Sequence, residues 1–150
     1  MSERNLDLVR GYFAAVDEVL LARAADPATP LEAGADLLFE SFLAPDAEWS
    51  PPFLPGGYRG RDGWVRAARD WLEVADGWKV EVEELVEGEG DRVLAVLRVF
   101  IQGKGSGAAY GQRVYAVLPI AGGRITGVLD FTEEAEAREA AGLPPATDRA

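Results

Sequence analysis

The second half of the chain contains four apolar, β-rich runs that are joined by three short connections, each containing glycine. The runs cover residues 78–86, 93–102, 110–120 and 124–131. Glycine supplies the positive φ angles that hairpin turns require, and each connection has the length of a hairpin loop. Three consecutive hairpins predict an antiparallel meander, and this constrains the fold more than any other part of the sequence.

Three helical segments are expected before these strands, because apolar residues recur at helical spacing over 5–25, 30–44 and 62–75. Asp62 is a suitable N-cap for the third segment. A short strand is expected at 47–50, followed by a loop rich in proline and glycine.

A last helix is expected over 132–141, with Thr132 as its N-cap and Gly142 as its C-terminal cap. Helices followed by a long antiparallel meander indicate an α+β protein with the helices packed on one face of the sheet. The chain has the length of a single domain, which we expect to span 1–143, with 144–150 as a flexible tail.

The run over 93–102 is apolar on both faces, because Leu94 and Val96 alternate with Val93, Ala95 and other apolar residues. A sheet of this kind has to be covered on both sides. With all helices on one side, the second face either meets another subunit or encloses a pocket. We therefore expect a homodimer.

The composition excludes several classes of function. The chain has 26 acidic and 15 basic residues, and its net charge of −11 disfavours nucleic acid and anionic membrane surfaces as partners. It has no cysteine and no histidine, which removes disulfides, thiolate nucleophiles, the commonest general base and the usual zinc site. Chemistry would depend on carboxylates, hydroxyls and cations, without a metal or another cofactor.

The N-terminus has no apolar signal core, so we expect a cytoplasmic protein.

Asp130 is the best single candidate for chemistry. It is the only carboxylate in the apolar run 125–131, and Arg98 interrupts the run 93–101 in the same way. Burial raises the pKa of a carboxyl group, and groups with perturbed pKa values cluster at functional sites. Arg98 is the expected partner of Asp130. Equally, the two could form a structural ion pair, or either could point outward at a sheet edge.

Three further patterns have simpler structural explanations. The glycine-rich run 103–107 lacks the spacing of a phosphate-binding loop and is followed by a strand rather than a helix, so it is interpreted as a hairpin. The acidic residues over 81–91 lack the looped spacing of a calcium site, and a solvated edge strand explains them. Trp64 and Trp71, seven residues apart, are more typical of a core than of a ligand cage.

Five different short sequence motifs follow one another along the chain, at 5–10, 43–49, 58–63, 123–125 and 140–143. Examples are Leu-Ala-Pro-Asp-Ala-Glu-Trp before the first strand and Tyr-Arg-Gly-Arg-Asp-Gly before the third helix. In this order the chain resembles the SnoaL-like polyketide cyclase family, within the nuclear-transport-factor-like superfamily that also holds limonene epoxide hydrolase and ketosteroid isomerase. The resemblance implies a cone of curved antiparallel sheet with helices on its concave side around a pocket, and usually a dimer across the back of the sheet.

The resemblance also implies site residues. In the cyclases an Asp on the last strand acts as general acid/base, and Asp130 stands at that position. Limonene epoxide hydrolases add an Arg-x-Asp on the central strand, which matches Arg98 with Phe100 in place of the second acid. Ketosteroid isomerases place their base in the first strand, where the match puts Ser50, and this disfavours their reaction.

We therefore expect a cofactor-independent cyclase, isomerase or hydrolase-like enzyme that binds a small apolar or aromatic molecule. Asp130 would transfer the proton, and Arg98 would hold that carboxylate or stabilise an oxyanion. The alternative is a non-catalytic binding module in which Arg98 and Asp130 form a structural pair. The pocket walls are expected to come from the aromatic residues Tyr12, Trp49, Phe53, Trp71, Phe100 and Tyr115.

Overall fold

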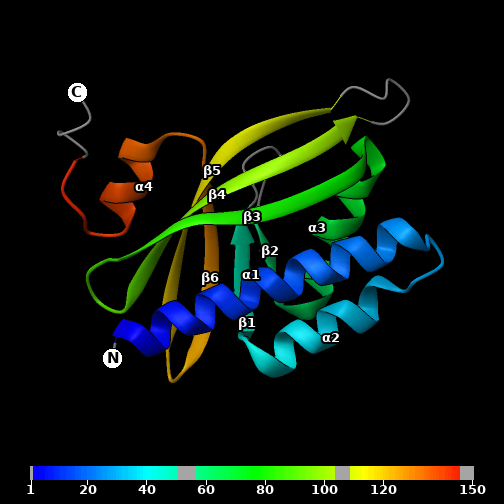
Figure 1. Ribbon diagram of the computed structural model, residues 1–150. Coiled ribbons are helices and arrows are strands. Elements are labelled where there is room, and N and C mark those ends of the chain that lie inside the picture. Colours follow the sequence, from blue (N-terminus) through cyan, green and yellow to red (C-terminus); the bar gives the residue numbers. More distant parts are fainter. Residues whose placement is uncertain (1, 51–56, 104–108, 146–150) are drawn as a thin grey trace.

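The computed structural model describes residues 2–50, 57–103 and 109–145. Helices and strands follow one another along this part of the chain as the sequence predicts, with one short strand added (Figure 1). In chain order the elements are α1 (Ser2–Ala25), α2 (Leu31–Ser41), β1 (Leu43–Ser50), β2 (Tyr58–Arg59), α3 (Gly60–Val74), β3 (Ala75–Glu87), β4 (Arg92–Gly103), β5 (Ala109–Ala121), β6 (Arg124–Phe131) and α4 (Glu134–Ala140).

The strands form one curved sheet in the order β2-β1-β6-β5-β4-β3. The predicted antiparallel meander from β3 to β6 is confirmed. The sheet as a whole is mixed, however, because β1 runs parallel to β6. Parallel neighbours need a long connection, and here α3 and the meander together provide it. The added strand β2 pairs with β1 within the region that was expected to be a loop.

The turn between β5 and β6 shows why the meander could be predicted from the sequence. Gly122 and Gly123 have φ angles of 59° and 76°. Positive φ at both central residues is the geometry of a two-residue type I′ hairpin, which suits the twist of the flanking strands. Glycine adopts these angles without the strain that a side chain would bring. Residues 104–108, in the second connection, lie outside the described residues.

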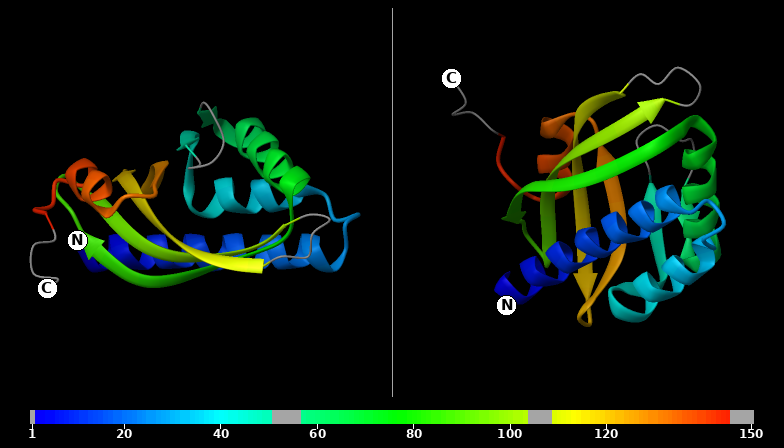
Figure 2. Two further views of the ribbon diagram at one scale, coloured as in Figure 1. Left: turned by 90° about the horizontal axis from the view of Figure 1, so that it is seen from above. Right: turned by 45° about the vertical axis from the view of Figure 1, so that its right-hand side comes forward.

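The helices lie on both faces of the sheet, and the prediction that all of them share one face is wrong. Helices α1, α2 and α3 form one core with the β4 residues Val93, Ala95 and Leu97. Helix α4 packs against the opposite face, where Ala137 and Ala141 bury Leu94. Figure 2 shows the curvature of the sheet, with α3 and α4 near its opposite ends.

Helix α4 therefore covers part of the face that was expected to require a second subunit. Val96, on the same face, is 7% exposed within the single chain. Further along β4 the face becomes polar at Arg98, and Phe100 is 40% exposed. The need to cover apolar surface is thus smaller than the alternation in the sequence suggested. The homodimer stays a prediction.

The end of α4 confirms one predicted cap, and its start does not confirm the other. Gly142 has a φ angle of 73°, and the N–H of Leu143 donates a hydrogen bond to the Arg138 carbonyl at 2.8 Å. This is the Schellman arrangement that glycine favours at the end of a helix. At the start, Glu133 occupies the N-cap position without a side-chain cap bond, so the prediction of Thr132 there is wrong.

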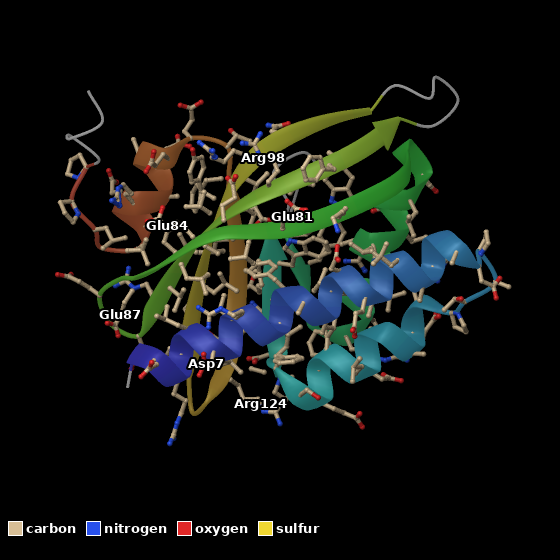
Figure 3. The ribbon with its side chains drawn as sticks, in the orientation of Figure 1. Asp7, Glu81, Glu84, Glu87, Arg98 and Arg124 are labelled. Atoms are coloured by element: carbon tan, nitrogen blue, oxygen red, sulfur yellow. The ribbon has the colours of Figure 1, made fainter. Side chains whose placement is uncertain are left out.

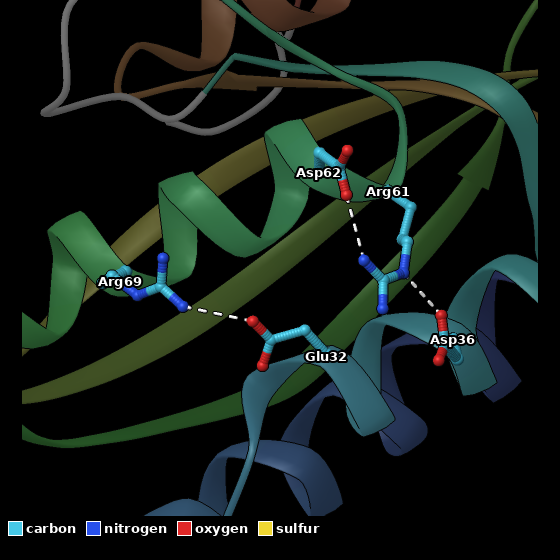
Figure 4. Close-up of polar contacts among 5 residues, drawn as sticks. All are labelled: Glu32, Asp36, Arg61, Asp62 and Arg69. Carbon is cyan, nitrogen blue, oxygen red and sulfur yellow. Dashed lines mark hydrogen bonds and ion pairs between the residues drawn. The ribbon is translucent and has the colours of Figure 1, made fainter.

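Ion pairs connect the exposed sides of α2 and α3 (Figure 4). Arg61 contacts Asp36 at 2.6 Å and Asp62 at 3.0 Å, and Arg69 contacts Glu32 at 3.3 Å. The guanidinium of Arg61 lowers the pKa of Asp36. Exposed pairs of this kind contribute little to stability, because water and salt screen them. They help to orient α3, the helix that carries two of the tryptophans described below.

A substitution in the connection after β3 tests how closely α4 packs against the sheet. A Cβ atom at Gly88 would collide with the backbone oxygen of Ala141, which already accepts a hydrogen bond from the Glu89 N–H at 2.9 Å. We expect Gly88→Ala to lower the free energy of unfolding by about 1–3 kcal/mol, the usual cost of overpacking. Gly57→Ala is the control, because its nearest neighbours would lie at 3.9 Å. Equal melting temperatures for both variants would contradict this packing.

Candidate active site

A cavity lies between the sheet and helices α1 and α3. Five aromatic side chains and one carboxyl group line it, together with aliphatic side chains from the helices and strands. The aromatic residues are Tyr12, Phe13, Trp49, Trp64 and Trp71, and the acid is Asp130. The volume open to the centres of water molecules is about 60 Å³. One water needs roughly 10–15 Å³ on this measure, so the cavity has room for a few waters or a small organic group.

The alternation of β4 decides which of its side chains reach the cavity. Leu97 and Val99 line the cavity, and Arg98 between them points to the opposite face. On β6, Asp130 lies opposite Ala116 of β5, a residue of the core formed by α1 to α3. Asp130 is therefore on the cavity side of the sheet.

The Asp130 carboxyl group is held by one hydrogen bond from the first strand. The Nε1–H of Trp49 donates to Oδ2 of Asp130 at 3.0 Å. Burial among apolar groups raises the pKa of Asp130 to about 7, and the bond from Trp49 opposes this rise. Near neutral pH the carboxyl group is populated in both its protonated and its ionised form, as proton transfer requires.

Tyr12 adds a second polar group to the cavity. It is 3% exposed, and the Trp64 indole lies near its hydroxyl group, where it acts to lower the pKa of Tyr12. Burial raises the pKa of Tyr12, and the nearby charge of Asp130 raises it further. The phenol therefore keeps its proton at neutral pH and can donate it to a ligand. Trp64 in turn stacks on Trp49, with ring centroids 5.9 Å apart.

The structure brings four of the expected site residues to one cavity. Tyr12, Trp49, Trp71 and Asp130 all line it. Phe53 lies outside the described residues. The remaining three, Arg98, Phe100 and Tyr115, are on the other face of the sheet.

The expected pairing of Arg98 with Asp130 is wrong. The Nε atom of Arg98 lies 3.6 Å from Oε2 of Glu83, and Glu83 also contacts Arg113 at 3.0 Å. Arg98 is in register with Glu81 on β3 and Arg113 on β5, so the three side chains share one face of the sheet. Figure 3 labels Arg98 and Glu81 on these neighbouring strands. The sheet itself separates this cluster from Asp130.

Phe100 and Tyr115 are also misplaced in the sequence-based prediction. Phe100 shares the face of Arg98 and is 40% exposed, so it does not replace a carboxylate in the cavity wall. The expected match of Arg98 and Phe100 to the epoxide hydrolases therefore does not place them in the cavity, because the β4 residues that line it are Leu97 and Val99. Tyr115 lines a shallow hollow on the outer face beside Glu83.

Sequence reasoning interpreted Trp64 as a core residue, although it also lines the cavity. A usable signal was present, because Trp64 and Trp71 lie seven residues apart and so share one face of α3. Among the described residues, no group of three or more acidic side chains could hold a metal ion. In the same part of the chain no helix is long and apolar enough to cross a membrane.

Comparison with known proteins agrees with this architecture. The profile of the SnoaL-like domain matches residues 31–128, and the chain belongs to this family. An uncharacterized protein of Mycobacterium tuberculosis is 32% identical over 141 residues, which cover 91% of this chain and 95% of the relative.

Solved structures share the fold at low identity. TerC, co-crystallized with polyporic acid, has a TM-score of 0.69 at 18% identity, with 91% of this chain and 96% of that chain covered. SalBIII, described as an epoxide hydrolase/cyclase-like enzyme in pyran ring formation, has a TM-score of 0.66 at 17% identity, with 88% and 92% covered. The fold is thus the α+β cone of the nuclear-transport-factor-like proteins.

The raised pKa of Asp130 predicts how stability depends on pH. An unfolded Asp ionises near pH 3.8, whereas the folded protein keeps the proton up to about pH 7. Because the folded state binds more protons between these values, the free energy of unfolding falls as pH rises through this window, by on the order of 2–4 kcal/mol. The variant Asp130→Asn should lack this fall and gain stability relative to wild type between about pH 4 and pH 8.

Denaturant unfolding at about pH 4 and about pH 8 measures the difference in the free energy of unfolding between Asp130→Asn and wild type. The matched control is Asp46→Asn, which removes an exposed carboxylate of β1. A stability difference between Asp130→Asn and wild type that is the same at both pH values would show that burial does not perturb this carboxyl group.

Proposed function

We propose that this protein is a cofactor-independent enzyme that acts on a small apolar or aromatic molecule and uses Asp130 as general acid/base. The observation that carries the proposal is the Asp130 carboxyl group, whose pKa burial raises to about 7, in a cavity whose other described lining residues are apolar or aromatic. A general base works best when its pKa lies near the working pH. Membership of the SnoaL-like family supports this assignment without specifying a reaction.

Asp130 and Tyr12 have different roles in the proposed reaction. Oδ2 of Asp130 is held by Trp49, which leaves Oδ1 to take a proton from a carbon or oxygen atom of the substrate. The Tyr12 hydroxyl, which keeps its proton at neutral pH, donates to the oxygen on which negative charge develops. Return of the proton from Asp130 to a different atom completes an isomerisation or a cyclisation.

The same cavity disfavours hydrolysis of an epoxide by two carboxylates, one activating water and the other protonating the epoxide. Asp130 is the only acid among the described residues that line it. A mechanism that divides the two roles between two acids therefore lacks one of them here. SalBIII shares the fold at 17% identity, and this similarity does not supply the second acid.

The alternative of a binding module with a structural Arg98–Asp130 pair loses its basis, since Arg98 is bound to Glu83 on the other face. A binding function would therefore depend on the cavity and not on an ion pair. Proton transfer makes direct use of a carboxyl group whose pKa lies near neutral pH, and this supports the enzyme.

Hydrogen–deuterium exchange at the α-carbon of ketones tests proton transfer without knowledge of the natural substrate. Incubation with a panel of small cyclic ketones in D2O should show exchange above the buffer rate for those that fit the cavity. Asp130→Asn should lower this exchange by about 10²-fold or more, the usual scale of general acid/base catalysis. Asp46→Asn, with its change on the exposed side of β1, should retain it. Exchange that survives Asp130→Asn unchanged would assign the base elsewhere.

A further inference from the structure

The cavity carries a potential negative charge, and its described lining residues supply no counter-charge. No lysine or arginine is among the described residues that line it. Arg98, the cation expected beside Asp130, is bound to Glu83 on the opposite face. When Asp130 ionises, the Trp49 indole is the one hydrogen-bond donor to it among the described residues. A bound cation would supply the missing charge, whereas a bound anion would be repelled.

The walls suit an organic cation better than a metal ion. Hard cations need several oxygen ligands, and the described lining offers one carboxyl group. Five aromatic side chains surround it, three of them tryptophans. Aromatic rings, tryptophan above all, attract cations within about 6 Å. In a cavity of about 60 Å³ an occupant cannot lie far from these rings.

We propose that this cavity binds a small tertiary or quaternary ammonium ion, with its positive charge beside Asp130 and its alkyl groups against Trp49, Trp64 and Trp71. The net charge of −11 on the chain favours the approach of such a cation over that of an anion. The inference rests on the site of the proposed function, but it requires only binding and not proton transfer.

Protonation of Asp130 and binding of the cation exclude one another. A proton removes the negative charge that the cation needs, so affinity should rise with pH until Asp130 is fully ionised. Below about pH 7, affinity should change by about tenfold per pH unit, and above about pH 8 it should become constant. Binding below this point releases one proton.

Choline and 3,3-dimethylbutan-1-ol are the two probes, because they have the same shape and differ in the charged nitrogen. Tryptophan fluorescence and calorimetry measure binding to the full chain, in which three of the four tryptophans line the cavity. At pH 8 we expect choline to bind at least about tenfold more tightly than the neutral alcohol. Asp130→Asn should abolish this preference, and Asp46→Asn should keep it.

Several results would overturn the inference. These are equal or tighter binding of the alcohol at pH 8, choline affinity that does not change between pH 5 and pH 8, or a preference that survives Asp130→Asn. The pH series on the wild-type protein remains decisive even if that variant fails to fold. The ketone exchange reports the proposed function separately. Exchange that depends on Asp130 without choline binding would refute the cation site alone, and choline binding without exchange would refute proton transfer alone.

Discussion

The hydrogen bond from the Trp49 indole to the Asp130 carboxyl group joins the two halves of the molecule. Trp49 lies on β1, which follows the first two helices, and Asp130 lies on β6, which ends the meander. These strands are the parallel pair of the sheet, and their pairing sets Trp49 opposite Val128. Helix α3 then places Trp64 against Trp49, and the Trp64 indole lies near the Tyr12 hydroxyl of α1. The polar groups of the cavity are thus connected in one chain of contacts, and their geometry depends on the pairing of β1 with β6.

Much of the fold could be predicted because its signals are local. The glycines of the β5–β6 turn fix a hairpin, and the spacing of apolar residues fixes α1 and α3. Asp130 was identifiable for the same reason, as a lone acid in an apolar strand near the end of the meander. Membership of the SnoaL-like family agrees with the order of these elements.

Local signals could not predict which side chains of β4 point toward α1 and the cavity. Its inward residues Val93, Ala95 and Leu97 are apolar, but so are the outward residues Leu94 and Val96. The alternation therefore gives no sign of which set meets α1, and a displacement of one residue reverses the answer. Because the sequence does not show which face of β4 is inward, Arg98 was expected beside Asp130 although it lies on the outer face. The side of the sheet that α4 covers is likewise a tertiary choice, made by contacts between Ala137 and Leu94 that are far apart in the sequence.

The central claim is that burial in this cavity brings Asp130 to a pKa suited to proton transfer. The most direct test is an NMR titration of the carboxyl carbon of Asp130, assigned by comparison with Asp130→Asn. The account predicts a midpoint near pH 7, well above the ordinary value of 3.8 for Asp. A midpoint near pH 4 would contradict it, because the carboxyl group would then be fully ionised at neutral pH and would behave as a solvated surface acid.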